Sequence, residues 1–158
     1  MSQLLGKELP EALFQRLNGQ AVGDHEGKII PILTLDEPGW PHPALLSYYE
    51  VVAKNSSTLD IGLWKNSSTA INLRERGKIT LLIADKGTNF YIKGVVKELQ
   101  PEIPGIPQQS RFRVIIEQIL EDQEPNAEIT SGLTYRRRKA RTATDHAVEV
   151  FNQLREEP

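Results

Sequence analysis

The chain of 158 residues, with 39% apolar and 25% charged side chains, has the composition of an average soluble globular domain, so we expect one domain over residues 1–158. Its 11 glycines and 10 prolines exclude a collagen-like or low-complexity chain, and its longest apolar run, Leu81 to Ala84, excludes a membrane-spanning helix of roughly 20 residues. Cysteine is absent, which excludes disulfides, thiolate nucleophiles and thiolate metal sites, and the formal charge is −2.

The first predicted element is a short amphipathic helix. Pro10 suits its first turn, Leu13 and Leu17 have helical spacing, and Asn18-Gly19 suits its end. Lys28 to Leu35 is β-branched and apolar, and Ala44 to Val52 again has an extended apolar pattern. Because three prolines and a glycine separate the two runs, we expect a wide hairpin.

The next predicted strand, Thr58 to Trp64, alternates cleanly, with Leu59, Ile61 and Leu63 on one face. Its other face carries Asp60 and Gly62, so we expect a half-buried strand. A short helical segment, Thr69 to Arg74, follows a polar turn. Ser67 or Ser68 is available as its N-cap and Gly77 ends it.

Two more strands, Lys78 to Ala84 and Asn89 to Glu98, flank the hairpin turn at residues 85–88. The first is apolar on both faces, which predicts a place in the centre of the sheet. After a proline-containing loop, Phe112 to Leu120 fits a period of two and predicts another strand. We also predict a strand at Ala127 to Tyr135 and a closing helix at Thr144 to Leu154, capped by Thr144 or Asp145.

These elements predict a mainly β (α+β) fold, an antiparallel barrel or open sheet with short helices at the N-terminus, mid-chain and C-terminus. A parallel doubly wound sheet is not expected because helices do not alternate with strands. The N-terminus has no basic region followed by an apolar stretch, so we expect a cytoplasmic protein without a secretory signal. His25, His42 and His146 lack the spacing of a metal-binding pair, so we expect no metal site.

The turn at Lys65 to Thr69 is the candidate anion site. It opens a helix whose first backbone N–H groups have no internal partner, and serine and threonine hydroxyls and the Lys65 ammonium lie beside them. Gly62 would let a flat ring approach the preceding strand, and Trp64 would supply an apolar wall. The alternative is an ordinary capped helix after a strand, in which the serines have no ligand.

A family resemblance rests on the order of these elements: the wide hairpin, the strand ending near Trp64, the Ser-x-x-x-Asn-Leu helix (Ser68 to Leu73), and the strands Lys78–Ala84 and Asn89–Lys97. From Lys28 to Tyr135 the chain resembles the pyridoxamine 5′-phosphate oxidase-like flavin-binding split barrels. The resemblance implies a six-stranded antiparallel split β-barrel, a homodimer, and FMN at the dimer interface. The strand-to-helix turn is implied to hold the FMN phosphate.

Carried over by position, the resemblance places the phosphate at the turn, with Asn72 behind it. It places the ring system near Ser47 and Tyr48 of the second predicted strand and Asn89 of the fifth. The candidate cofactor-binding residues are Ser47, Tyr48, Trp64, Lys65, Asn66, Ser67, Ser68, Thr69, Asn72 and Asn89.

Three cations of FMN-binding relatives are absent from this chain. Arg and Lys often stand where it has Ser68 and Thr69, and an Arg where it has approximately Ala44. Neutral hydroxyls bind a phosphate less strongly than charged donors. Lys65, Lys93 or a partner subunit's arginine from the run Arg136 to Arg141 would replace them.

The sequence therefore predicts an FMN-binding flavoprotein, a small oxidoreductase of unknown substrate in which the flavin carries the hydride or electron transfer. No side chain is identified as a catalytic acid or base. The alternative is a split-barrel dimer that has lost flavin binding and acts as a non-catalytic binding or stress protein. A deazaflavin or a haem in place of FMN stays open.

The run Arg136 to Arg141 carries five positive charges, which leaves 14 basic against 21 acidic residues elsewhere. Five cations within six residues suit nucleic-acid phosphates. Because the whole chain is acidic and few aromatic residues accompany the run, we favour a solvated face or an intersubunit anion contact over nucleic-acid binding.

Overall fold

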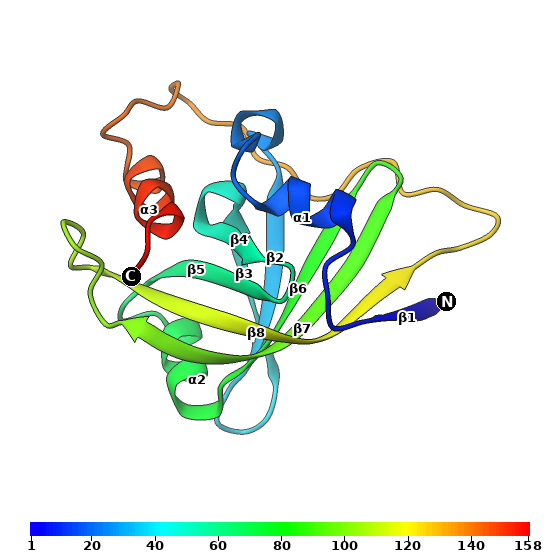
Figure 1. Ribbon diagram of the computed structural model, residues 1–158, viewed down its shortest axis with the longest axis horizontal. Coiled ribbons are helices and arrows are strands. Elements are labelled where there is room, and N and C mark those ends of the chain that lie inside the picture. Colours follow the sequence, from blue (N-terminus) through cyan, green and yellow to red (C-terminus); the bar gives the residue numbers. More distant parts are fainter.

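A computed structural model describes all residues, 1–158, as one curled antiparallel sheet with short helices around it (Figure 1). The helices are α1 (Glu11–Leu17), α2 (Ser68–Arg76) and α3 (His146–Arg155), with the 3₁₀ turns η1 (Val22–His25) and η2 (Tyr48–Glu50). The strands are β1 (Ser2–Gly6), β2 (Ile29–Leu35), β3 (Pro41–Ser47), β4 (Val51–Asn55), β5 (Thr58–Trp64), β6 (Lys78–Asp85), β7 (Thr88–Gln100) and β8 (Gln109–Asp122).

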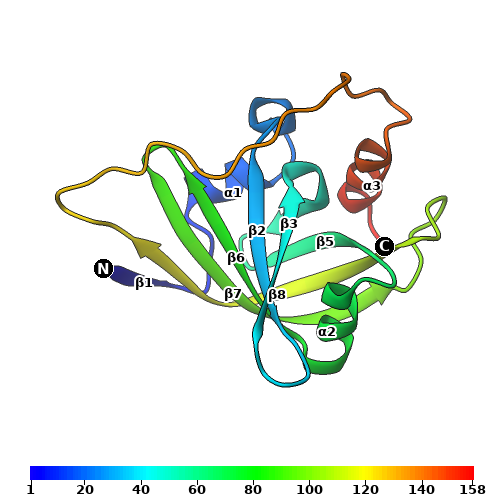
Figure 2. The same cartoon turned by 180° about the vertical axis from the view of Figure 1, so that it is seen from behind.

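The strand order along the sheet is β3-β2-β6-β7-β8-β5-β4, and β1 pairs with β8 outside this path. The two ends of the path, β3 and β4, are consecutive in the chain and joined by η2, so the sheet curls into a split barrel (Figures 1 and 2). The predicted mainly β split barrel with helices at the N-terminus, mid-chain and C-terminus is confirmed. None of the helices is long and apolar enough to cross a membrane.

The sheet has eight strands where six were predicted for the barrel. All six predicted barrel runs are extended, but the second is divided into β3 and β4. The division occurs at η2, where Ser47 and Glu50 form a capping box that turns the chain. The eighth strand is β1, which pairs with β8 through its backbone although its side chains are almost all exposed.

The main core fills the barrel. It contains Leu59, Ile61 and Leu63 of β5, as their alternation predicts, together with the inward residues of β2, β6, β7 and β8. The predicted central place of β6 is confirmed, because β6 lies between β2 and β7. α1 packs Leu13 and Leu17 onto the same core.

A second, smaller core lies between the outside of the barrel and α3. Val150, Phe151 and Leu154 of α3 pack there with Tyr49 and Val52. The expectation that β5 is buried on one face only is therefore wrong. α3 covers its second face, and a Cβ added at Gly62 would lie 2.5 Å from Val150 Cγ1.

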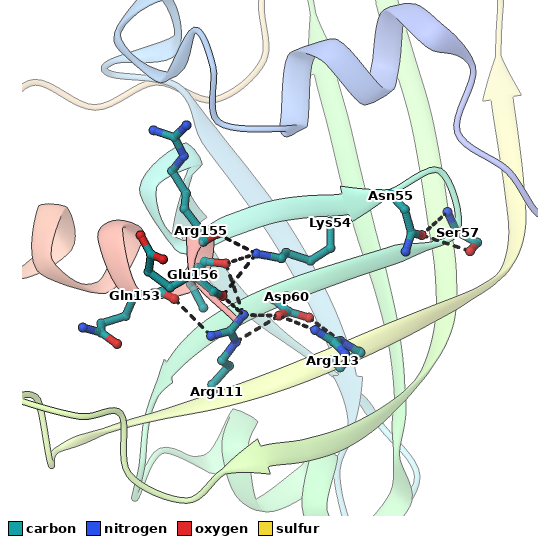
Figure 3. A network of polar contacts seen from close by, with 10 residues as sticks. Lys54, Asn55, Ser57, Asp60, Arg111, Arg113, Gln153, Arg155 and Glu156 are labelled. Carbon is teal, nitrogen blue, oxygen red and sulfur yellow. Dashed lines mark hydrogen bonds and ion pairs between the residues drawn. The ribbon is translucent and has the colours of Figure 1, made fainter. Parts of the chain in front are cut away.

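A polar clamp fastens the C-terminal end of α3 (Figure 3). Arg111 donates from Nε and Nη2 to Asp60 Oδ2 at 2.9 and 2.6 Å, and Arg113 Nε donates to Asp60 Oδ1 at 2.8 Å. Arg111 also donates to the carbonyls of residues 153, 154 and 156, and Lys54 Nζ donates to those of residues 154, 155 and 156. Asp60 is fully buried, so the clamp neutralises its charge and satisfies the last carbonyls of α3.

The predicted strand at Ala127–Tyr135 is wrong. This segment is part of the connection from β8 to α3, which crosses the end of the barrel (Figure 2). Its backbone makes scattered bonds: Ile29 N–H donates to Leu133 O at 3.0 Å, and Gly87 N–H donates to Ile129 O at 2.9 Å. The segment crosses strand ends rather than running along a strand, so no continuous ladder can form.

Candidate functional site

The polar turn before α2 is a helix cap, as the simpler interpretation predicts. Ser67 Oγ accepts from the N–H of Ala70 at 3.1 Å and donates to Trp64 O at 2.8 Å. Gly77 ends the helix in the left-handed region, with φ of 64°. The Ser67 hydroxyl thus both donates and accepts a hydrogen bond within the protein, which leaves it little capacity to bind a ligand.

The turn still offers free donors to an anion. The backbone N–H groups of Ser68 and Thr69 have no partner within the chain, and the side chains of Asn66 and Ser68 are exposed. Thr69 is buried. The N-terminus of a helix favours negative charge, so the turn can hold a phosphate through two amides and the Ser68 hydroxyl.

The cations near the turn are already paired. Lys65 Nζ lies 2.5 Å from Glu102 Oε1, and Arg74 donates to Glu98 at 2.6 Å and to the carbonyl of Lys65 at 2.7 Å. The Lys65–Glu102 pair is exposed, and such pairs contribute at most about 1 kcal/mol. Lys65 can therefore exchange its carboxylate for a phosphate at small cost, whereas Arg74 is held in place.

Asn72 and Lys93 lie outside the turn. Asn72 is buried, donates to Thr34 Oγ1 at 3.0 Å and accepts from Arg76 at 2.9 Å, so it links α2 to β2. Lys93 lies on the outer face of the sheet, beside a separate cavity of about 550 Å³. Neither residue adds a donor to the candidate phosphate site.

Trp64 lies between the turn and α3. Its side chain is 58% exposed, and its ring stacks on that of His146 with centroids 5.0 Å apart. The expectation that a flat ligand ring approaches β5 at Gly62 is wrong, because Val150 fills that space. His146 in turn lines a cleft.

This cleft has a volume of about 480 Å³ and lies between the end of β3, η2 and the N-terminus of α3. Its apolar lining includes Leu45, Leu46 and Ala147. Its residues with polar side chains are Ser47, Glu50, Tyr135, Arg137, Arg141, Asp145 and His146. This volume lies within the range of small-molecule sites.

Ser47 and Glu50 present a fixed carboxyl group to this cleft. The hydroxyl and the backbone N–H of Ser47 both donate to Glu50 Oε1, at 2.8 and 3.3 Å. Burial raises the pKa of Glu50 above its usual value, although the bonds from Ser47 act in the opposite direction. Ser47 thus lies in the cleft, where it holds the carboxyl group of Glu50 in place. The sequence analysis predicted Ser47 but missed Glu50.

Tyr48 and Asn89 lie elsewhere. The Tyr48 hydroxyl accepts from Arg16 at 3.2 Å inside the barrel end, and its ring stacks on His25. Burial raises the pKa of this phenol. Asn89 lies at the start of β7 and lines another cavity, of about 700 Å³. No residue of the cleft or of the turn lines this cavity. The structure therefore brings Ser47 to the Trp64 region but not Tyr48 or Asn89.

Two arginines of the basic run fold inward. We call residues Arg136–Asp145 the strap. Arg141 is anchored by Glu26 at 2.8 Å, by Asp145 at 3.0 Å and by the Tyr135 hydroxyl at 2.7 Å, with its guanidinium over the ring of Tyr49. Arg137 also donates to Asp145.

The remaining cations of the run, Arg136, Arg138 and Lys139, are exposed. Burial raises the pKa of Asp145, but the Ala147 amide and the two arginines outweigh it and lower the pKa below its usual value.

No protein-family model matches the chain. It is similar to YclD, an uncharacterized protein of Bacillus subtilis strain 168, with 30% identity over 125 residues, which are 79% of this chain and 81% of YclD. Among solved structures, a protein of the pyridoxamine 5′-phosphate oxidase type from Lactobacillus delbrueckii has a TM-score of 0.60 and 15% identity, over 75% of this chain and 98% of that chain. HupZ from Group A Streptococcus has a TM-score of 0.57 and 15% identity, over 78% of this chain and 99% of that chain.

Proposed function

Because this chain belongs to the same family as YclD and has the fold of the pyridoxamine 5′-phosphate oxidase-like split-barrel proteins, we propose that it binds FMN at the interface of a homodimer and acts as a small oxidoreductase. One observation carries the proposal. Trp64 directly precedes the open turn and stacks on His146, which lines the cleft. Trp64 thus connects the turn, where a phosphate tail would lie, with a residue of the cleft, where a flat ring would lie.

The turn is the proposed phosphate site. The N–H groups of Ser68 and Thr69 and the Ser68 hydroxyl supply neutral donors, and Lys65 supplies the charge after it leaves Glu102. The partial positive charge of the α2 N-terminus adds to this attraction. The residues present therefore fit a phosphate, but with fewer charged donors than an arginine-rich site has.

The cleft is the proposed ring site. Leu45, Leu46 and Ala147 give it apolar surface, and Glu50, Arg137 and His146 give it hydrogen-bonding groups. When bound, FMN supplies hydride or electron transfer. The chain's own contribution is to orient the ring, to limit the access of water beneath the strap and to leave room for a substrate.

The outward face of β2 and β3 is the proposed dimer surface. Ile30, Ile32 and Thr34 of β2 point into the barrel, so the alternate residues of β2 and their partners on β3 point outward. These outward residues are apolar and no helix covers them: Leu33, Leu35, Pro41, Pro43 and Leu45. Leu45 is 58% exposed and also lines the cleft, so a second copy on this face would complete the ring site.

FMN titration tests the proposal. Protein purified from a host supplied with riboflavin should carry a flavin absorption spectrum, and the apoprotein should bind FMN. Lys65→Ala should weaken FMN binding several-fold. Ser68→Asp should weaken it by about tenfold or more, because a carboxylate there repels the phosphate. An acidic residue in the first turn does not destabilise α2, so the fold should persist.

The matched control is Lys97→Ala, which removes an exposed lysine of β7 that forms no ion pair. It should bind FMN like the wild type. A colourless protein without measurable FMN affinity would refute the proposal. In that case the second candidate function, a non-catalytic split-barrel dimer, is favoured by the neutral Ser68 and Thr69 and by the Lys65–Glu102 pair.

A further inference from the structure

His146 carries an unsatisfied polar atom beside the cleft. Its Nε2 is buried and has no hydrogen-bond partner, although the ring is fixed by stacking on Trp64. A buried polar atom without a partner is costly, and native proteins satisfy such atoms with protein groups, water or a ligand. Because His146 lines the cleft, a molecule in the cleft is the available partner.

Glu50 provides an acceptor in the same cleft. Its Oε1 is bound by the hydroxyl and the N–H of Ser47, while Oε2 has no protein donor. The capping box fixes the carboxylate before any ligand arrives. A fixed acceptor loses little conformational entropy on binding, so Glu50 suits recognition of an N–H group.

Arg137 provides donors. A guanidinium has five N–H groups, and Arg137 uses only those directed at Asp145 and at the carbonyl of Lys139. Its Nη1 has no partner within the chain. The carboxylate of Asp145 also receives Arg141, which is only 10% exposed and anchors the strap to the barrel. Arg137 is therefore held at the cleft with donors to spare.

The charges that line the cleft balance. Arg137 and Arg141 face the carboxylates of Glu50 and Asp145. A balanced lining does not favour an ion. It suits a neutral flat molecule that presents both donors and acceptors on one edge, since each polar group of the cleft then finds a partner.

We propose that Glu50, Arg137 and His146 recognise the imide edge of the flavin ring, where one N–H lies between two carbonyl groups. Glu50 accepts from the imide N–H, Arg137 donates to a carbonyl, and His146 Nε2 bonds to the same edge. This inference rests on the proposed function, and it selects among the cofactors that the sequence left open. FMN and a deazaflavin both carry the imide edge, whereas a haem does not.

The test compares lumiflavin with 3-methyl-lumiflavin, two ring probes without a phosphate. The methyl group removes the imide donor. Quenching of flavin fluorescence by the protein measures both affinities, independently of any enzyme activity. The wild type should bind lumiflavin about tenfold or more tightly than the methylated probe, as expected for the loss of a charge-assisted hydrogen bond.

Glu50→Gln and Arg137→Gln should weaken lumiflavin binding by a similar factor, and Glu50→Gln should also reduce the discrimination between the two probes. The control Arg138→Gln changes the adjacent, exposed cation of the strap and should leave both affinities unchanged. Thermal unfolding of each variant checks that the fold persists.

The outcomes separate this inference from the proposed function. If FMN binds and responds to Ser68→Asp, but the two probes bind equally or the Glu50 and Arg137 variants behave like Arg138→Gln, the imide contact is wrong and the FMN proposal stands. If neither FMN nor lumiflavin binds, both fail. Binding of haemin, with a Soret band abolished by His146→Ala, together with no lumiflavin affinity would also overturn both.

Discussion

The two ends of α3 meet the barrel in different ways. At the C-terminal end, Lys54 and Arg111 satisfy the last carbonyls, and Asp60 balances the guanidinium charge within a buried clamp (Figure 3). At the N-terminal end, His146 has an unsatisfied nitrogen and Trp64 is exposed beside a cleft. One end is closed and satisfied, as expected for stability, whereas the other has spare hydrogen-bonding capacity, as expected for a ligand site.

The clamp should give the largest effect on stability. Arg111→Gln leaves the buried Asp60 with only Arg113 and removes donors from three helix carbonyls. We expect the free energy of unfolding to fall by about 3–5 kcal/mol, the usual cost of breaking a buried ion pair. Urea unfolding measures it. Arg113→Gln is the matched control. It removes the donor of Asp60 Oδ1, but the Arg113 side chain is more exposed and binds no carbonyl of α3, so we expect a smaller loss of about 2 kcal/mol. Equal losses would contradict the central role of Arg111.

The contact of Gly62 with α3 should give the next effect. Gly62→Ala places a methyl group 2.5 Å from Val150 Cγ1, and overpacking of this kind costs about 1–3 kcal/mol. Val150→Ala removes the clashing methyl groups, so Gly62→Ala should cost less in that background than in the wild type. Urea unfolding of the two single variants and the double variant completes the cycle. Purely additive losses would mean that α3 does not pack on Gly62.

The cleft carboxyl Glu50 should give a smaller effect that depends on pH. Burial raises its pKa in the folded protein above the ordinary value of 4.5. The folded state then binds more protons than the unfolded state, so this group lowers stability as pH rises through 4.5 towards the folded pKa. Glu50→Gln removes the penalty. Its stability relative to the wild type should increase between pH 4 and pH 7 in urea unfolding, and a pH-independent difference would disagree with a buried carboxylate.

His146→Ala should give the smallest effect on stability, within about 1 kcal/mol, because the residue belongs to the open end of α3. Its spectroscopic effect should be larger. In a Trp40→Phe background the tryptophan fluorescence reports on Trp64 alone, and loss of the stacked imidazole should change its intensity. An unchanged spectrum would show that the two rings are not stacked in solution. A large loss of stability would make His146 a structural residue instead.

Much of the fold could be predicted because it depends on local patterns. The alternation of Leu59, Ile61 and Leu63 predicted β5, and the Ser67 and Gly77 signals predicted both ends of α2. The prediction of a strand at Ala127–Tyr135 was wrong, because a β-type pattern does not reveal whether a neighbouring strand is present to pair with it. The candidate site was predicted at the turn, where capping and anion binding use the same residues, but of the cleft only Ser47 was predicted.

Local patterns in the sequence determined an antiparallel barrel or open sheet, a capped mid-chain helix and a turn with open amides, because spacing and turn chemistry act over a few residues. The split barrel itself was implied by the family resemblance. Only the tertiary structure decided that α3 covers Gly62 and that Glu50 and Arg137 share a cleft with His146. These residues are far apart in the chain, and periodicity does not record which outer face of a sheet a distant helix will cover. Burial and pairing across that distance depend on how the whole chain packs.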